Sequence, residues 1–251
     1  LLAAASVLYS HSFALSSGAG RSEPLRSLLG MSLGTLAVSV FFVVSGFLVT
    51  ASLLSRPSIT SFLLARARRI YPALWVALGL TVLLLGPMAT SSSVRDYLAD
   101  PRTWFYLAKN ATLVFGFADG LPEVFAGLPM PRTINGSLWT LPTEVRLYLA
   151  LALMFGALRL VAGRRAGAWM RLAIAVVALT LFLRLCLQGG AASPESRFGT
   201  LFFGGALLQV GPPAQRPSAR GAAVLVAACI AAAQVGGDTF LVVFTLAIVH
   251  L

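Results

Sequence analysis

Long apolar runs separated by short polar gaps dominate the pattern along the chain. A helical span needs about 20 apolar residues to cross a hydrocarbon core of roughly 30 Å, and most of these runs approach that length. By position they are 1–17, 33–54, 70–88, 103–118, 145–162, 172–187, 198–210, 221–236 and 240–251. The pattern predicts an all-α fold, a polytopic transmembrane helical bundle of about eight spans with one re-entrant or interfacial segment.

The re-entrant or interfacial segment follows from the distribution of charge. Arginine gathers in three gaps that contain no acidic residue, which are 55–69, 163–171 and 211–220. The positive-inside rule places such gaps in the cytoplasm. If 70–88 leaves the cytoplasm and 145–162 returns to it, the run 103–118 between them makes no net crossing. Lys109 and Asn110 also interrupt this run, so we expect it to be packed against protein or water. The alternative is that it crosses and the charge rule fails downstream.

Composition narrows the class of protein further. Of the 251 residues, 58% are hydrophobic and 11% are charged, whereas roughly 25% are charged in soluble domains. These values exclude both a soluble globular domain and a disordered chain. The net charge of +11 would indicate nucleic acid in a soluble protein. Arginines between spans instead fit anionic head groups, so we expect membrane lipids as partners and no nucleic acid.

The whole chain, 1–251, is expected to form one integral-membrane domain, because no repeat or soluble segment interrupts the runs. Its first and last residues lie inside apolar runs. We therefore expect a fragment, a domain that is incomplete at its N-terminal start and at its end.

His11 is the first candidate for chemistry. It lies near the end of the first apolar run, and an ionisable side chain within a membrane span is a functional hypothesis by default. A neutral imidazole accepts a proton near neutral pH, which suits a general base. The alternative is an interfacial histidine at a helix end. His250, the other histidine, receives no role.

Arg66 and Arg69 are the second candidate. They are three residues apart, so they share one face if they lie in a helix. Guanidinium groups bind phosphate through two hydrogen bonds, so the pair could hold the phosphates of a nucleotide or coenzyme at the cytoplasmic edge. The alternative is a stop-transfer cluster that binds no ligand.

The third candidate is the segment 135–148, Asn-Gly-Ser-Leu-Trp-Thr-Leu-Pro-Thr-Glu-Val-Arg-Leu-Tyr. Pro142 can open a helix, which places Glu144 in its first turn, where a helix N-terminus favours an anion. Tyr148 follows four residues later on the same face. Trp139 and Tyr148 could instead be aromatic residues of the membrane interface, with Glu144 only a first-turn acid.

Other chemistries are not indicated. The chain contains no Walker A, Gly-x-Gly-x-x-Gly, Gly-x-Ser-x-Gly or His-Glu-x-x-His sequence and no paired Cys-x-x-Cys, so we expect no dedicated metal site. Ser45-Gly46 in the second run would let another helix approach closely, and this pair indicates packing.

Four blocks in this order resemble the membrane-bound acyltransferase 3 family. They are the opening helix with its histidine, Leu1–Ser12; the Ser-Gly-Phe helix, Phe41–Leu48; the arginine pair before Ile70-Tyr71-Pro72; and Trp139, Thr140, Leu141, Glu144 and Tyr148. The form Asn-Gly-Ser-Leu-Trp-Thr-Leu-Pro, after Lys109-Asn110-Ala111 and Leu121–Phe125, is similar to a subgroup that acylates cell-surface or exported sugars. The chain departs from the family because it lacks the arginine before the histidine helix and the last one or two spans.

The resemblance implies an O-acyltransferase of the bacterial cytoplasmic (inner) membrane. It would move an acyl group, most commonly acetyl, from acyl-CoA to a hydroxyl of a carbohydrate or lipid-linked sugar. Acyl-CoA would be the donor substrate, with no permanently bound cofactor. His11 would take the hydroxyl proton or carry the acyl group transiently, and Glu144 would orient His11 or the acceptor. The sugar would contact Asn135, Trp139 and Tyr148, and the donor phosphates would contact Arg66 and Arg69.

The predicted topology leaves these groups apart. It puts His11 and Glu144 near the outer face and the arginine pair near the inner face, roughly 30 Å away. A transporter or flippase for a lipid-linked sugar is the alternative function, because it explains the spans and His11 without chemistry. Turnover of acyl-CoA distinguishes the two, since a transporter needs no acyl donor. A structural subunit is a third interpretation, and it would not need the Trp–Glu–Tyr block.

Overall fold

The computed structural model describes residues 2–17, 23, 24, 26, 31–56, 58–128, 134–188 and 193–211. The elements named within these ranges are all helices, and they form no sheet; Thr90 and Val124 make an isolated antiparallel bridge. The predicted all-α class is therefore confirmed for the described part of the chain. The predicted spans 221–236 and 240–251, the gap from 212 to 220 and His250 lie outside the described residues.

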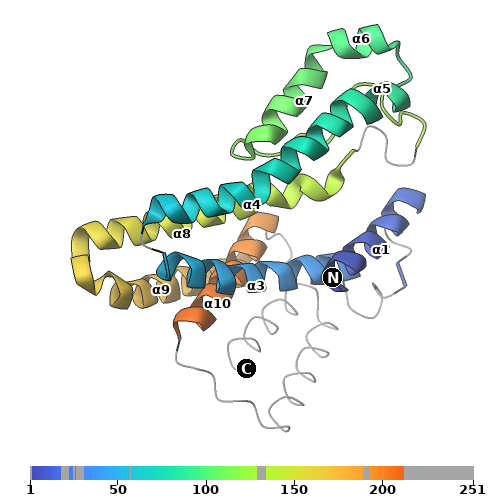
Figure 1. The fold of residues 1–251 in the computed structure, drawn as a ribbon. Helices are drawn as coiled ribbons and strands as arrows, with labels where there is room; N and C mark the ends of the chain where they lie inside the picture. The colour runs from blue at the N-terminus through green and yellow to red at the C-terminus, as the bar shows by residue number, and fades with distance from the viewer. Residues whose placement is uncertain are drawn as a thin grey trace. The chain divides into compact units, whose positions relative to one another are not determined.

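The chain divides into two compact units. The first unit comprises Leu1–Arg56 and Leu151–Leu251, and the second unit comprises Pro57–Ala150. Helix α8, Leu141–Ala162, begins in the second unit and ends in the first. Figure 1 labels the helices of both units along the chain.

The first unit consists of long apolar helices with serine caps. Besides the second half of α8, its helices are α1 (Leu2–Ser17), α3 (Leu33–Leu54), α9 (Ala166–Gln188) and α10 (Pro194–Val210). Ser32 and Ser193 precede α3 and α10, and each side-chain oxygen accepts a backbone N–H three residues on, at 3.0 and 3.3 Å. Such caps satisfy N–H groups that have no partner within the helix.

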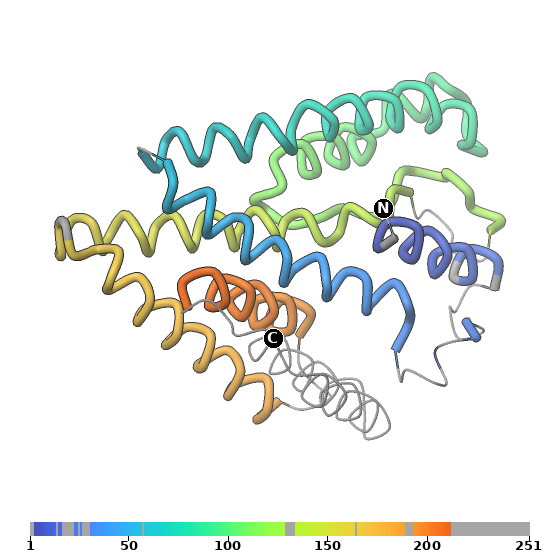
Figure 2. Tube along the Cα trace, turned by 60° about the horizontal axis from the view of Figure 1, so that its bottom comes forward, coloured from blue at the N-terminus to red at the C-terminus, as the bar shows by residue number. Residues whose placement is uncertain are grey.

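Helices α3 and α10 pack at very short range, and α10 also packs against α9 (Figures 1 and 2). Gly46 of α3 lies against the backbone of Phe202, and Gly205 of α10 lies against the backbone of Val43. A Cβ on either glycine would overlap a carbonyl oxygen of the other helix. Small residues permit this approach between apolar helices, so the packing role expected of Ser45-Gly46 is confirmed for Gly46.

The second unit combines one long bent helix with short helices and an ordered loop. Its elements are α4 (Ile59–Leu80), the π-helical segment η1 (Thr81–Leu85), α5 (Gly86–Ala89), α6 (Val94–Ala99), α7 (Pro101–Thr112), the 3-10 helix η2 (Gly136–Thr140) and the start of α8. Pro72 lies inside α4, as prolines can in membrane helices whose freed backbone groups find other partners.

The start of α4 corrects the prediction that 55–69 is a loop. The Ser58 side chain accepts the Ser61 N–H at 3.1 Å, and the helix begins at Ile59. Charged residues do not end a helix by themselves, whereas a capping serine defines its first turn. Arg66 and Arg69 therefore lie inside α4.

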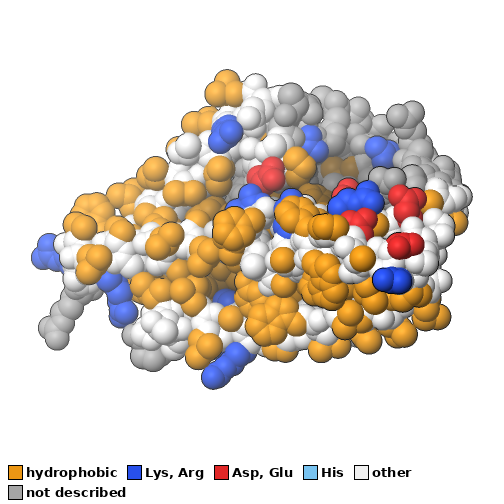
Figure 3. All heavy atoms as spheres, turned by 90° about the horizontal axis from the view of Figure 1, so that it is seen from above, with side chains coloured by type: hydrophobic (Ala, Val, Ile, Leu, Met, Phe, Trp, Pro, Cys, Tyr) orange, Lys and Arg blue, Asp and Glu red, His pale blue; other side chains and the backbone are white. Residues whose placement is uncertain are grey.

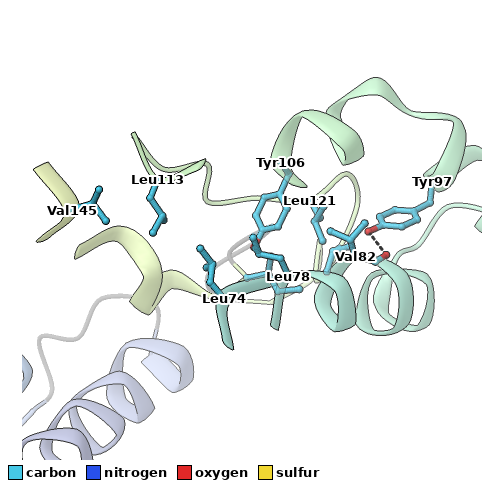
Figure 4. Close-up of a cluster of buried hydrophobic side chains, with 10 residues drawn as sticks. Leu74, Leu78, Val82, Tyr97, Tyr106, Leu113, Leu121 and Val145 are labelled. Atoms are coloured by element: carbon cyan, nitrogen blue, oxygen red, sulfur yellow. Dashed lines mark hydrogen bonds between the residues drawn. The ribbon is translucent and has the colours of Figure 1, made fainter. Parts of the chain in front are cut away.

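A buried cluster joins α4 and η1 to α7 and the loop that follows α7 (Figure 4). Its fully buried members include Leu78, Val82, Tyr97, Tyr106, Leu113 and Leu121. Two α4 side chains also donate to carbonyls at the end of α7, Tyr71 Oη to Thr112 at 2.9 Å and Trp75 Nε1 to Ala111 at 3.2 Å. Carbonyls in the last turn of a helix lack partners within it, so these bonds hold α7 along α4.

Four described helices are long and apolar enough to cross a membrane. They are Leu33–Leu54, Ile59–Ala89, Gly136–Ala162 and Ala166–Gln188. Helices α1 and α10 have 16 and 17 residues, and the total of about eight spans stays a prediction. Helix α7 has 12 residues, which extend about 18 Å, so it is too short to cross by itself, in keeping with an interfacial segment.

Large apolar side chains are exposed along these helices. Hydrophobic side chains cover much of the face drawn in Figure 3. Trp75, Leu153 and Leu160 are among the exposed ones. Broad apolar surfaces are unfavourable in water and favourable in lipid, so this surface is that of an integral membrane protein.

Candidate active site

Glu144 is the centre of a polar cluster in the second unit. It lies in the first turn of α8, as predicted, and is 6% exposed. The Tyr148 hydroxyl, one turn later, donates a hydrogen bond to its Oε1. The positive charges of Arg69 and Arg66 act on the same carboxylate. A buried carboxylate is costly unless other groups stabilise its charge, and the hydrogen bond from Tyr148 and these two positive charges lower that cost.

This cluster corrects the predicted separation of Glu144 from the arginine pair. The roughly 30 Å gap assumed that the arginines lie in a cytoplasmic loop. Because α4 begins at Ile59, Arg69 lies about 15 Å along the helix at 1.5 Å per residue. Arg66 and Arg69 also act on one carboxylate, which agrees with the shared helix face predicted from their spacing. Arg68, which lies between them, is not among the charges that act on Glu144.

Trp139 and Asn135 precede Glu144 along the chain, in the segment that leads into α8. Trp139 belongs to η2 and is partly exposed. Asn135 precedes η2 in a left-handed conformation, with φ of 54°, which asparagine tolerates better than most residues. Its Nδ2 donates to Thr81 Oγ1 at 2.6 Å and to the Tyr106 hydroxyl at 3.4 Å. Asn135 thus connects the segment before α8 to η1 and α7 by hydrogen bonds. Its contact with a sugar stays a prediction.

The π-helical segment was not predicted from the sequence. The Tyr97 hydroxyl donates to the Val82 carbonyl at 3.0 Å, and Gly86 leaves room for the Tyr97 ring. A π-helical turn leaves backbone groups without their usual partner, and such segments are frequent at functional sites. Burial, followed by the nearby Tyr106, raises the pKa of Tyr97 to about 12, so this hydroxyl stays a donor. No local pattern marks the segment, because its donor lies 15 residues away.

His11 lies in the first unit, on α1, and is partly buried. The preceding residue, Ser10, donates from its hydroxyl to Glu23 Oε2 at 2.9 Å. The Leu33 N–H, at the start of α3, donates to Glu23 Oε1 at 2.7 Å. Glu23 is 3% exposed, although it lies in the polar gap between the first two apolar runs. It ties the helix that carries His11 to the N-terminus of α3.

The predicted pairing of His11 with Glu144 stays a prediction, because the two residues belong to different units. Within the described ranges, no three His, Cys, Asp or Glu side chains form a metal-binding group. What the second unit brings together is a carboxylate, a phenol and two guanidinium groups. Such a set can bind an anion and orient a hydroxyl.

Comparison with known proteins identifies the class. The family described as "Acyltransferase domain" matches residues 1–250, and the chain therefore belongs to the acyltransferase 3 family. An "O-acetyl transferase" of Shigella phage Sf6 is 37% identical over 150 residues, which cover 59% of this chain and 42% of that protein. "Nodulation protein 10" of Rhizobium leguminosarum bv. viciae is 30% identical over 184 residues, 71% of this chain and 47% of that protein.

A third relative, "Acyltransferase MdmB" of Streptomyces mycarofaciens, is 31% identical over 134 residues, which cover 53% of this chain and 32% of that protein. The match thus spans less than half the length of each of these three relatives. No solved structure matches the chain.

Proposed function

We propose that the protein transfers an acetyl group from acetyl-CoA to a hydroxyl of a cell-surface or exported carbohydrate, which can be lipid-linked, at the bacterial inner membrane. The family match and the relative named O-acetyl transferase support acyl transfer. The observation that carries the proposal is the Glu144 cluster, where Arg66 and Arg69 act on one buried carboxylate. Two positive charges face one negative charge, which favours an incoming phosphate.

The arginine pair would bind the donor. Guanidinium groups hold phosphate oxygens through paired hydrogen bonds. The pair lies roughly 10 to 15 Å along α4 from Ile59, at 1.5 Å per residue. If the cytoplasmic boundary of the membrane lies at Ile59, the phosphates of a donor bound there would be partway into the membrane, and its acyl arm would need to cover less than the full thickness of the bilayer.

The reaction would use His11 as the general base. Its imidazole takes the proton of the acceptor hydroxyl while the hydroxyl oxygen attacks the thioester carbonyl. The carbon–oxygen ester bond forms, the carbon–sulfur bond breaks, and the thiolate of CoA leaves and takes up a proton. Glu144 would orient His11 or the acceptor, and Asn135, Trp139 and Tyr148 would contact the sugar. In a variant of this route the acyl group rests on His11 before it reaches the acceptor.

The donor site can be tested with the full-length protein in membranes and radiolabelled acetyl-CoA. The double substitution Arg66→Ala and Arg69→Ala should raise the KM for acetyl-CoA about tenfold or more, since charge-assisted contacts to phosphate are lost. Arg68→Ala is the matched control, because Arg68 lies on the same helix but is not among the charges that act on Glu144. Lysine at positions 66 and 69 should restore donor binding only in part, because an ammonium group lacks the guanidinium fork.

An unchanged KM for acetyl-CoA in the double variant, at matched protein level, would contradict the donor site. Mass spectrometry of surface glycans with and without the gene tests the reaction itself. Loss of acetyl ester groups on deletion is expected. Intact esters, together with a defect in sugar export, would favour a transporter instead.

A further inference from the structure

The second unit contains a groove that no predicted site residue lines. It lies between α7 and the loop 117–122, with a volume of about 500 Å³. Its walls include Arg102, Phe105, Tyr106 and Lys109 from α7, and Phe117 and Asp119 from the loop. Arg66, Arg69, Trp139 and Glu144 are not among the lining residues. The volume falls within the usual range for sites of small ligands, about 300–1,000 Å³.

The groove is built from ordered elements. Asn110, which is fully buried, donates from Nδ2 to the Ala118 carbonyl at 2.9 Å and accepts the Ala118 N–H through Oδ1 at 3.0 Å. This pair of bonds fastens the loop to α7. Leu121 is buried in the cluster below, beside Tyr106 (Figure 4). A site that needs little ordering on binding loses less affinity to conformational entropy.

Backbone of unusual conformation flanks the loop 117–122 on both sides. Leu113, Glu123 and Phe125 have positive φ values of 57°, 53° and 51°, which are uncommon for residues with side chains. Such conformations persist where the surrounding structure enforces them, and they cluster at ligand sites. Leu113 precedes the loop segment that lines the groove, and Glu123 and Phe125 follow it.

The charges of the groove are balanced. Arg102 forms an ion pair with Asp100 at 2.6 Å, which lowers the pKa of the Asp100 carboxyl through their hydrogen bonds. Lys109 lies over the Phe105 ring, with Nζ 5.6 Å from the centroid, and Asp119 supplies one negative charge. A phosphate would meet this carboxylate as well as the lysine, so the groove does not favour an anion.

Aromatic faces and separate polar groups favour a different ligand. The Phe105 side chain is 61% exposed, and Phe117 of the loop also lines the groove. Aromatic rings supply apolar surface for the C–H face of a sugar ring. Lys109 offers donors and Asp119 offers acceptors for hydroxyl groups. This set matches a neutral, polyhydroxylated molecule.

The groove is also connected to the candidate active site. Tyr106 lines the groove, and its hydroxyl accepts a hydrogen bond from Asn135 at 3.4 Å. Asn135 directly precedes η2, which carries Trp139. Figure 4 shows Tyr106 and Leu121 in the middle of the cluster, with Val145, the neighbour of Glu144, at one end. A ligand in the groove would therefore lie apart from the reacting group but on the same rigid cluster.

We propose that this groove is a docking subsite for a neutral stretch of the carbohydrate acceptor, away from the hydroxyl that is acylated. The inference rests on the proposed function for the identity of the acceptor. A long acceptor would occupy both the groove and the Glu144 region, whereas a single sugar would occupy one at a time. The groove would thus favour long carbohydrate acceptors over short ones.

The test uses surface polysaccharide isolated from a strain that lacks the gene, together with the monosaccharides released from it by hydrolysis. The variant Phe105→Ala with Phe117→Ala should raise the KM for the polysaccharide about tenfold, since aromatic anchors carry a large share of binding energy. The kcat at saturating polysaccharide and the KM for acetyl-CoA should stay close to those of the unsubstituted protein. The same double variant should raise the KM for the monosaccharides less than it raises the KM for the polysaccharide.

A matched control and a second variant keep the result clear. Phe115→Ala removes an aromatic ring that is 79% exposed, two residues before Phe117, and does not line the groove. It should leave the KM for the polysaccharide unchanged. Asp119→Asn keeps the volume of the side chain but removes its charge, and it should weaken polysaccharide binding several-fold if Asp119 accepts sugar hydroxyls.

Direct binding separates this inference from the proposed function. The purified protein in lipid nanodiscs is titrated with the polysaccharide, an oligogalacturonide and CoA. Loss of polysaccharide binding in the double variant supports the groove even if the unsubstituted protein transfers no acetyl group. Unchanged KM and unchanged binding would overturn the groove while acetyl transfer stands. Binding of only the oligogalacturonide or CoA, lost with Lys109→Met, would identify an anion site and also overturn it.

Discussion

Each of the two units buries a glutamate, but different groups stabilise the two carboxylates. Glu23 accepts hydrogen bonds from the Ser10 hydroxyl and the Leu33 N–H. Glu144 accepts one from Tyr148 and is subject to the charges of Arg66 and Arg69. A backbone N–H at a helix N-terminus is fixed in place, whereas a guanidinium on a long side chain can exchange one anion for another.

This difference separates an anchor from a functional cluster. The bonds to Glu23 join α1 to α3 and would be lost only if those helices moved. The counter-charges of Glu144 are side chains that a phosphate could also attract. Burial alone therefore does not identify a catalytic carboxylate, and the nature of its partners is more informative.

The largest expected effect is that of His11→Ala. His11 is the proposed general base, whereas Glu23 only holds the helix that carries it. Removing the His11 imidazole should therefore lower acetyl transfer about 10²–10⁴-fold. His11→Gln should lose nearly as much, because glutamine forms hydrogen bonds but does not take a proton. Ser12→Ala, at the exposed neighbouring position, is the control. Near-normal glycan acetylation by His11→Ala, at matched protein level, would remove His11 from the mechanism.

Glu144→Gln should have the next largest effect. Glutamine keeps an acceptor for Tyr148 but removes the negative charge that faces Arg66 and Arg69. If Glu144 orients the reacting groups, transfer should fall about 10- to 100-fold, as expected for misplaced reactants. Glu195→Gln is the matched control, since Glu195 is also a first-turn acid but is exposed. A loss of thermal stability without a loss of activity per folded molecule would make Glu144 an anchor like Glu23.

Glu23→Ala should act mainly on stability. The substitution removes two part-buried hydrogen bonds, from the Leu33 N–H and the Ser10 hydroxyl, each of which stabilises the fold by about 1 kcal/mol. The thermal midpoint in detergent should fall, while acetyl transfer per folded molecule should change less than with Glu144→Gln. Ser10→Ala removes one of the two bonds and should cost about 1 kcal/mol. Inactive but fully stable Glu23→Ala protein would give Glu23 a direct role in the reaction.

Local spacing was enough to predict some of these contacts. Tyr148 lies four residues after Glu144, and Arg69 three after Arg66, so helical periodicity alone places each pair on one face. The starts of α3 and α10 also depend on nearby serines. Each of these contacts involves residues within one helical turn, where the backbone fixes the distance between side chains.

Longer-range contacts could not be predicted in this way. Ser10 and Glu23 are 13 residues apart, and Asn135 and Thr81 are 54 apart. The extension of α4 to Ile59 was missed because an apolar run marks the part of a helix in lipid, not the whole helix. The groove was missed because Phe105 and Phe117 looked like ordinary apolar residues of one interrupted run.

The sequence by itself determined that this is a helical membrane protein of the acyltransferase 3 type, because hydropathy and short motifs are local properties of the chain. Only the tertiary structure decided that the charges of Arg66 and Arg69 act on Glu144 and that Glu23 anchors α1 to α3. It also decided that α7 and its loop enclose a groove. These features depend on how helices far apart in sequence pack. Packing between apolar helices is determined by the fit of whole surfaces and by hydrogen bonds between helices. No short segment of sequence specifies either of these.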